Sequence, residues 1–554
     1  MAYSDFHGCP SDPWAEDNDP LLDTDGSILY ETDYDGLLCA IIKRDDVTTL
    51  TRYLAKYPRA AIAPSMGDFC DPFYIAAKNG SLNALRMLVK HHYQNAGSIP
   101  LDGTCLVPPN ERGFLILNIA CYHAHIEMVR FLLDGEPPLG SVYAKDDWGE
   151  TALLAAAASL STLGSDADEI DHGAPEWMDR RLARREELIH LLLDSDAPAR
   201  YMRDQVAGRE KINLMPVPVD TVLGRAISRA SYALVKRLID AGADALEREE
   251  YSEMCGQWDF IGDVTKLHIA SRFWNVEGIR ALFDHLGEHE FRLMISCRDS
   301  EGCLPLHWAA KGARDCDENL LPEDQFISDI IRTFELLLSN GLNTINSPDN
   351  GGRTALHYAV GTHAPCGTGH RNTVIRFLCE HRADASLQDN NGQTALHILA
   401  FHSLSGCPID PALLDLLMKH GADAYHADNK GNTVLHVMAR NLQEVGAVQH
   451  LINIGVDVNT VNAVGNTPLH DAMSGGVWPR MSQTKDPVTL ADQISAQDEM
   501  IRILQEAGRP GLMDQPNTAG KTPRQLFDET RAKWQTRGNF RVRPSSGKSS
   551  GCPL

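Results

Sequence analysis

Hydrophobic and polar positions follow one another along this chain in a way that predicts a recurring pair of short helices. The sequence Asp389-Asn-Asn-Gly-Gln-Thr-Ala-Leu-His397 returns as Asp428-Asn-Lys-Gly-Asn-Thr-Val-Leu-His436. Between the copies, Pro411–Asp423 places apolar residues at helical spacing, and Gly421 ends that helix. A turn, a Thr-x-Leu-His helix start, a second helix and a Gly-Ala-Asp ending therefore form one repeating unit.

The residue types at fixed places in the unit fit that interpretation. Gly392 and Gly431 stand at the tip of a tight turn, where positive φ costs a glycine nothing. Thr394 and Thr433 are placed to cap the helix that follows. Leucines at the start of a buried stripe and small alanines for close helix packing complete both copies: Leu396, Leu435, Ala400 and Ala439.

These phrases resemble the ankyrin repeat, a β-turn followed by two helices in about 33 residues. The resemblance implies an all-α solenoid of about twelve units over residues 35–535, with degenerate first and last units that cap the stack. The clearest later helix starts lie at Gly302–Ala310, Gly352–Ala359 and Gly465–Ala472, and Gly520–Phe527 begins the last unit. Residues 1–34 are predicted to be an acidic disordered arm and residues 536–554 a basic disordered tail.

Several units are longer than the repeat requires. We predict that the extra residues lie between the two helices of units four, seven, eight, nine and eleven and project from one edge of the solenoid. In unit four, the sequence predicts an insertion over Gly164–Arg184 and a second helix over Arg185–Leu193. In unit eleven, it predicts the second helix over Glu499–Glu506.

Composition and charge restrict the classes of function. The formal net charge of −24 argues against direct binding of nucleic acid or of an anionic membrane. No apolar run approaches the roughly 18 residues of a membrane span, and the first residues lack the pattern of a secretory signal. The 13 cysteines include no Cys-x-x-Cys pair, which favours reduced thiols in a cytoplasmic or nuclear protein.

Six histidines recur at the Leu-His position. Taken alone, such a row of histidines would suggest metal ligands or groups that transfer protons. Packed helices lie about 8–10 Å apart, whereas zinc needs each nitrogen at about 2.0–2.1 Å, so neighbours cannot share one ion. The resemblance implies instead that they form structural hydrogen bonds at the helix start. The residues concerned are His268, His307, His357, His397, His436 and His470.

Other candidate chemistry is weaker, and we predict no catalytic, cofactor-binding or metal-binding residues. A zinc staple in unit eight is conceivable but matches no standard spacing; its candidate ligands are His363, Cys366 and His370, with His402 and Cys407 one unit away. Gly520-Lys521-Thr522 lacks the glycine that a phosphate-binding loop needs five positions earlier.

Charged clusters are expected to be solvated. Glu249-Glu250 is assigned to a polar connector, and the strip Arg180–Arg185 to an exposed helix face, with a basic binding patch as its alternative. The basic segment Arg531–Lys548 either contacts an acidic partner or folds back onto the acidic body.

The resemblance implies a protein-interaction function. We expect a monomeric, non-enzymatic scaffold or adaptor whose contact positions include the turn-tip residues Asn350, Asn390, Lys430 and Val464. One alternative is a regulator that masks a basic partner such as a transcription factor or enzyme. Another is a metal protein or enzyme with its site in the insertions around Gly361–His370 or Gly406–Asp410.

Overall fold

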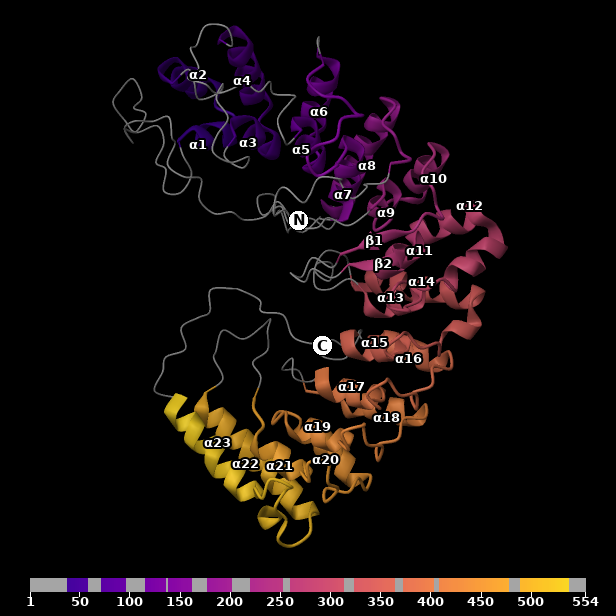
Figure 1. Cartoon of the computed structure of the whole chain (residues 1–554), viewed down its shortest axis with the longest axis vertical. Coiled ribbons are helices and arrows are strands. Elements are labelled where there is room, and N and C mark those ends of the chain that lie inside the picture. Colours follow the sequence, from indigo (N-terminus) through magenta and orange to yellow (C-terminus); the bar gives the residue numbers. More distant parts are fainter. Residues whose placement is uncertain are drawn as a thin grey trace. The chain divides into compact units, whose positions relative to one another are not determined.

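The computed structural model of the chain describes residues 37–57, 71–95, 115–135, 138–161, 177–201, 220–252, 260–312, 323–363, 372–402, 408–477 and 489–537. Within these ranges the chain is built from consecutive helix pairs, and two short strands are its only regular β-structure (Figure 1). The predicted all-α fold of repeated helix pairs is confirmed. The acidic arm at 1–34 and most of the basic tail lie outside the described residues.

The described residues form two compact units. The N-terminal unit runs to Lys266 and includes Arg280–His285, and the C-terminal unit contains Leu267–Ile279 and most of the chain from Leu286 onward. The first ten helices belong to the N-terminal unit: α1 (Leu37–Lys43), α2 (Val47–Lys56), α3 (Pro72–Asn79), α4 (Leu82–Asn95), α5 (Ile116–Tyr122), α6 (Ile126–Asp134), α7 (Ala152–Ser161), α8 (Trp177–Asp194), α9 (Val222–Ala226) and α10 (Tyr232–Asp240). The antiparallel strands β1 (Glu249–Tyr251) and β2 (Ile261–Val264) follow them.

The remaining helices continue the same alternation. They are α11 (Lys266–Arg272), α12 (Val276–Ile295), α13 (Pro305–Lys311), α14 (Glu323–Asn340), α15 (Ala355–His363), α16 (Asn372–Glu380), α17 (Ala395–His402), α18 (Pro411–Lys419), α19 (Val434–Ala439), α20 (Val445–Asn453), α21 (Pro468–Met473), α22 (Leu490–Ala507) and α23 (Pro523–Arg537). Odd-numbered helices are the first members of their repeats, and α23 has no second helix among the described residues.

The core consists of the apolar stripe that the repeated phrase predicts. The helix-start leucines of the C-terminal unit are at most 1% exposed: Leu306, Leu356, Leu396, Leu435 and Leu469. Ala400 and Ala439 are also fully buried, as their small size suggested. Each buried leucine contributes about 1.5–3 kcal/mol. The stack is therefore held together by apolar contacts that each repeat makes with its neighbours.

The extra residues of the long repeats fall where the spacing predicted, between first and second helices. The undescribed segments 162–176, 313–322, 364–371, 403–407 and 478–488 separate α7 from α8, α13 from α14, α15 from α16, α17 from α18 and α21 from α22. Their predicted projection from one edge of the stack lies outside the described residues.

Two second helices begin earlier than predicted. Helix α8 starts at Trp177, inside the predicted insertion, and α22 starts at Leu490 instead of Glu499. The cause at α22 is a capping box, in which the Thr489 hydroxyl accepts from the Asp492 backbone N–H at 3.1 Å and the Asp492 carboxylate accepts from the Thr489 N–H at 2.9 Å. This Thr-x-x-Asp start was overlooked because the residues after it are mostly polar.

The last helix closes the stack with polar side chains. At the position of the buried helix-start leucine, α23 carries Arg524, which is exposed and pairs with Asp514. At the histidine position it carries Gln525, whose Oε1 accepts from the Thr522 backbone N–H at 3.0 Å. Because both positions face outward with polar groups, α23 acts as the predicted C-terminal cap.

Candidate functional site

The turns before the first helices of the C-terminal unit share one closed geometry. Asp389 Oδ1 accepts from the backbone N–H groups of Asn391 at 2.8 Å and Gln393 at 2.9 Å. Gly392, between them, has φ of 74°, which suits glycine. The same pair of bonds closes the turns that begin at four other residues: Asp299, Asp428, Asn462 and Asn517.

Neighbouring turns are bonded to one another through asparagine. The Asn390 N–H donates to the Gly351 carbonyl at 2.8 Å, and its side-chain amide donates to the Asn350 carbonyl at 2.9 Å. Asn429 repeats both bonds, to the carbonyls of Asn391 and Asn390, each at 2.9 Å. We call the six connected turns at 299–302, 349–352, 389–392, 428–431, 462–465 and 517–520 the turn row.

The four predicted contact residues all lie on the turn row and are all exposed. Two of them also have a structural part, because the side-chain amides of Asn350 and Asn390 donate to the preceding turn. Lys430 and Val464 extend from the row, and Val464 is 54% exposed. The sequence analysis missed Asn429, although the asparagine that follows the turn aspartate at 350, 390 and 429 is a visible signal.

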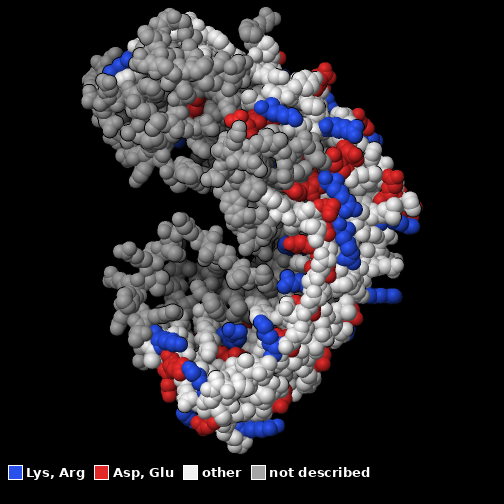
Figure 2. All heavy atoms as spheres, viewed as in Figure 1, with Lys and Arg blue, Asp and Glu red and all other residues white. Residues whose placement is uncertain are grey.

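Most exposed side chains of the turn row carry no charge. They are Ser300, Asn350, Asn390, Asn391, Asn429, Ala463, Val464, Thr518 and Ala519, and the charged exceptions are Glu301 and Lys430. On the face that Figure 2 shows, Lys and Arg residues are interspersed with Asp and Glu residues. The row is therefore suited to recognition by shape and hydrogen bonding more than by charge.

Five of the six histidines of the row join their helix start to a carbonyl of the following repeat. His436 Nδ1 faces the Thr433 backbone N–H at 3.1 Å and the Thr433 hydroxyl at 2.8 Å, and its Nε2 lies 3.0 Å from the Asn466 carbonyl. A backbone N–H can only donate, so Nδ1 accepts and Nε2 carries the proton. The equivalent Nε2 bonds to carbonyls join His268 to Cys303, His307 to Ser347, His357 to Gln393 and His397 to Asn432. The predicted structural role of these histidines is confirmed.

Burial keeps the row neutral. It lowers the pKa of His307 and His436 to about 4, despite the opposing charges of Asp349 and Asp428. It also lowers the pKa of His357, His397 and His470. At pH 7 these five histidines are therefore neutral, and they are not suited to proton transfer near neutrality.

In the fifth repeat the histidine is replaced by two residues. Gly224 occupies the histidine position of α9, and the carboxylate of Glu249 from β1 fills the vacated space. Glu249 Oε2 accepts from the Thr221 backbone N–H at 2.8 Å and from its hydroxyl at 3.0 Å, which are the bonds that histidine receives elsewhere. Lys266 Nζ lies 3.4 Å from Oε1.

The expectation that Glu249 is solvated was therefore wrong. Only 3% of the residue is exposed, and burial raises the pKa of its carboxyl although Lys266 opposes the shift. In the strip Arg180–Arg185, Arg180 and Arg184 are exposed as predicted, but Arg185 is 3% exposed and donates to the Ser159 carbonyl at 2.6 Å. Thr221 and Lys266, which contact Glu249, and Ser159, which contacts Arg185, are distant in sequence from these residues. A local sequence pattern therefore could not reveal the contacts.

The candidate metal and nucleotide sites gain no support from the described residues. His363, Cys366, His370, His402 and Cys407 lie outside the residues whose side chains are described. Among those that are described, no group of three His, Cys, Asp or Glu residues could hold a metal ion. The Lys521 ammonium of the phosphate-loop-like sequence is paired with Glu529 at 2.8 Å. In the same residues, no helix is long and apolar enough to cross a membrane.

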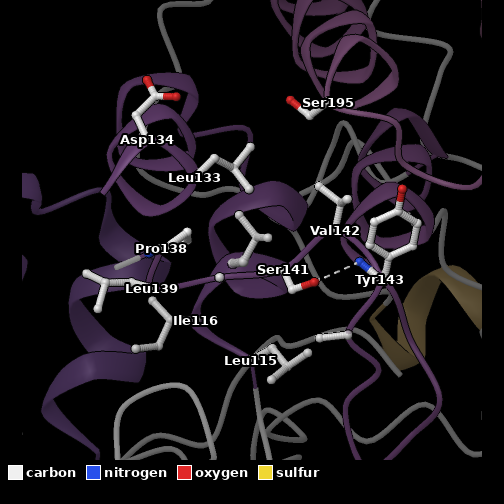
Figure 3. A pocket seen from close by; sticks show the side chains of 13 residues that line it. Leu115, Ile116, Leu133, Asp134, Pro138, Leu139, Ser141, Val142, Tyr143 and Ser195 are labelled. Atoms are coloured by element: carbon white, nitrogen blue, oxygen red, sulfur yellow. Dashed lines mark hydrogen bonds between the residues drawn. The ribbon is translucent and has the colours of Figure 1, made fainter. Parts of the chain in front are cut away.

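The N-terminal unit contains a hollow with a volume of about 590 Å³. Figure 3 shows that its walls come from the start of α5, the end of α6 and the connecting segment, with Leu115, Leu133 and Val142 around it. Its polar groups include Asp134 and Ser195.

Comparison with known proteins identifies the repeat. A family model described as ankyrin repeats (3 copies) matches residues 330–409 and 407–478. Over 177 residues, 32% of the chain, the sequence is 30% identical to Neurogenic locus notch homolog protein 1 of Danio rerio. Over 176 residues it is 27% identical to the Homo sapiens protein of that name. The matches cover only 7% and 6% of the length of these relatives.

Proposed function

This chain is an ankyrin-repeat protein, and we propose that it is a non-enzymatic scaffold or adaptor that binds a protein partner along its turn row. Ankyrin repeats are in general protein-interaction modules without catalytic activity of their own. The observation that carries the proposal is the double hydrogen bonding between successive turns, seen at Asn390 and Asn429. It holds exposed side chains at fixed spacing, and such pre-organisation reduces the entropy cost of binding.

The partner surface that suits this row is mixed polar and apolar. Asn391 and Thr518 offer hydrogen-bonding side chains, and Ala463 and Val464 offer apolar contact area. Central apolar positions surrounded by polar ones are typical of binding hot spots. We therefore expect Val464 to contribute more to the binding free energy than any other residue of the row.

Affinity capture of the partner by variants with single substitutions tests the proposal. Val464→Asp should lower capture of the bound protein at least tenfold, because a charge replaces an apolar contact. Leu293→Asp is the matched control, since Leu293 is 59% exposed in the same unit but lies on α12, away from the turn row. Binding on the row is contradicted if both variants lose capture equally, or if neither variant loses it.

The net charge of −24 favours a second candidate, in which the protein masks a basic partner. The salt dependence of the captured complex separates the two. Masking by charge requires affinity to fall steeply between low and moderate ionic strength, whereas the mostly uncharged turn row requires a shallow dependence. Versions shortened between α15 and α16 and between α17 and α18 show in addition whether the insertions take part.

A further inference from the structure

The two compact units differ at one repeated position in a way that gives them different responses to acid. In the C-terminal unit, six of the seven helix starts carry a histidine, and the last, in α23, carries Gln525. In the N-terminal unit, the same position is occupied by residues that do not titrate near neutrality: Tyr74, Asn118, Leu154 and Gly224. The connection itself can survive this change, because the Asn118 side-chain amide donates to the Glu150 carbonyl at 2.7 Å, as a histidine Nε2 does elsewhere.

The geometry of the histidines opposes a second proton. At His357 and His436, Nδ1 already receives the backbone N–H of Thr354 or Thr433 at 3.1 Å. A protonated imidazole has an N–H on both nitrogens, so Nδ1 would place a donor against a donor. The histidine must then turn away, which leaves a buried backbone N–H unpaired and removes the Nε2 bond to the next turn. A buried polar group that loses its hydrogen bond destabilises the folded state.

We propose that the C-terminal unit is an acid-sensitive stack, in which protonation of the helix-start histidines loosens the connections between repeats while the connections of the N-terminal unit hold. The proposal is independent of which protein the turn row binds. If the turn row does bind a partner, the same step would weaken that binding in mildly acidic surroundings.

Charged groups lie around the histidines and shift their pKa in both directions. Aspartates favour the protonated form at four of them: Asp349 near His307, Asp349 and Asp389 near His357, Asp389 and Asp428 near His397, and Asp428 near His436. Cationic neighbours oppose it: Arg298, Arg353, His426 and His470. Burial outweighs the aspartates, since the pKa of each of these histidines is lowered.

The direction of the effect follows from proton linkage. A histidine with a lowered folded-state pKa binds its proton more readily in the unfolded chain, so folding stability falls as the pH drops below about 6.5. For a pKa of about 4, as at His307 and His436, the folded-to-unfolded ratio falls roughly 20-fold between pH 7 and pH 5.

Buried carboxyl groups act in the opposite direction and are present in both units. Burial raises the pKa of Asp471 to about 6 in the C-terminal unit and that of Asp146 to about 6 in the N-terminal unit. The pKa is also raised at Asp299, Asp329 and Glu249. In the N-terminal unit, burial also lowers the pKa of His190, which lies outside the helix-start position. Because the helix-start histidines belong to the C-terminal unit, acid is expected to destabilise that unit more than the N-terminal unit.

Hydrogen exchange of the full-length protein, read by mass spectrometry at pH 7.5 and pH 5.0 and corrected for intrinsic exchange, tests the proposal. Peptides from α15, α17, α19 and α21 should lose at least tenfold in protection at pH 5.0, whereas those from α3, α5 and α7 should change less than threefold. Equal losses in both units, or no loss in the C-terminal unit, overturn it.

A variant separates the histidines from other acid effects. His357→Gln, His397→Gln and His436→Gln combined should abolish most of the loss, because the Gln525 side chain already makes the required bond to a threonine N–H in α23. The control is His289→Gln, an exposed histidine of α12, which should leave the loss intact. Loss of protection in the triple variant equal to that of the unmodified protein overturns the proposal. If the triple variant does not fold, the proposal is tested by the unmodified protein, through the comparison of hydrogen exchange in its two units at pH 7.5 and pH 5.0.

Discussion

Gly224 and Glu249 together occupy the place that one histidine takes in the later repeats. A Cβ on Gly224 would lie 1.9 Å from Glu249 Oε1, so the absence of a side chain on α9 is what admits the carboxylate from β1. The carboxylate then receives the Thr221 N–H and hydroxyl. The bonding scheme of the repeat is preserved, but its acceptor comes from a residue 25 positions later in the sequence.

A methyl group at position 224 should therefore lower the free energy of unfolding only while Glu249 is present. Gly224→Ala is expected to lower the free energy of unfolding by about 1–3 kcal/mol, the usual cost of overpacking. In a Glu249→Ala background, the same change should be neutral or stabilising by about 0.5–1 kcal/mol, since alanine favours a helix over glycine. Urea denaturation of the four proteins measures both effects.

Gly446 offers the matched control for that cycle. It lies within α20, and nothing lies within 4 Å of the Cβ it would gain. Gly446→Ala should stabilise by about 0.5–1 kcal/mol whether or not Glu249 is present. A Gly224→Ala cost that is independent of Glu249 would show that the two residues do not share this space.

The buried pair of Glu249 and Lys266 should respond strongly to loss of one partner. Lys266→Met leaves a buried carboxylate without its cation, and we expect a loss of about 3–5 kcal/mol at pH 7.5. Because the pKa of Glu249 is already raised by burial and Lys266 opposes that rise, the variant should protonate Glu249 more easily. The loss should therefore shrink as the pH falls towards 5, when the folded protein takes up the proton.

Arg248 provides the comparison for Lys266. It pairs with Asp263 at 3.7 Å, and both side chains are exposed. Arg248→Met should cost less than about 1 kcal/mol at either pH. If Lys266→Met costs no more than Arg248→Met in urea denaturation, the buried pair does not stabilise the hairpin connection.

The asparagine bonds between turns should contribute measurably to the C-terminal unit. Asn390→Ala and Asn429→Ala each remove a side-chain bond to the preceding turn and should cost about 0.5–1.5 kcal/mol. Exchange of the Asn390 and Asn429 backbone N–H groups should also become faster. Asn453→Ala, at an exposed position of α20, is the control, and it should change neither stability nor exchange in the turns.

The C-terminal cap should depend on Arg531. Its guanidinium donates to Gln497 Oε1 at 2.6 Å and to Asp498 at 2.5 Å, and it stacks on the Phe527 ring at 4.7 Å. Arg531→Ala should cost about 1.5–3 kcal/mol and make α23 exchange faster, because Gln497 is fully buried. Arg524→Ala removes only the exposed pair with Asp514 and should cost less than about 1 kcal/mol. Equal effects of the two changes would mean that Arg531 does not fasten the cap.

The parts of the fold that could be predicted from sequence are those that depend on local spacing. Leu396 and Gly392 have their roles within one helix or one turn, and His397 bonds the start of its own helix as well as the next repeat, so the repeated phrase located all three correctly. Glu249 and Arg185 were misjudged because burial depends on residues from other repeats. The hairpin of β1 and β2 was missed for a related reason, since its strands are only three and four residues long.

The candidate site was predicted in position but not in mechanism. Asn350 and Asn390 were expected to contact a partner, and the structure shows that they also fasten one turn to the preceding one. A sequence shows which residues recur at a turn, but the bond from one turn to the next needs the stacking distance between repeats. Lys430 and Val464, which we propose to face the partner, carry no signal that distinguishes them from ordinary exposed side chains.

The most direct test of binding along the turn row is a hydrogen-exchange footprint of the full-length protein with and without its captured partner. Binding on the row predicts slower exchange in peptides that span 349–352, 389–392, 428–431 and 462–465, with α16, α18 and α20 unchanged. Protection confined to those second helices, or to the segment 138–144 beside the hollow in the N-terminal unit, would contradict it.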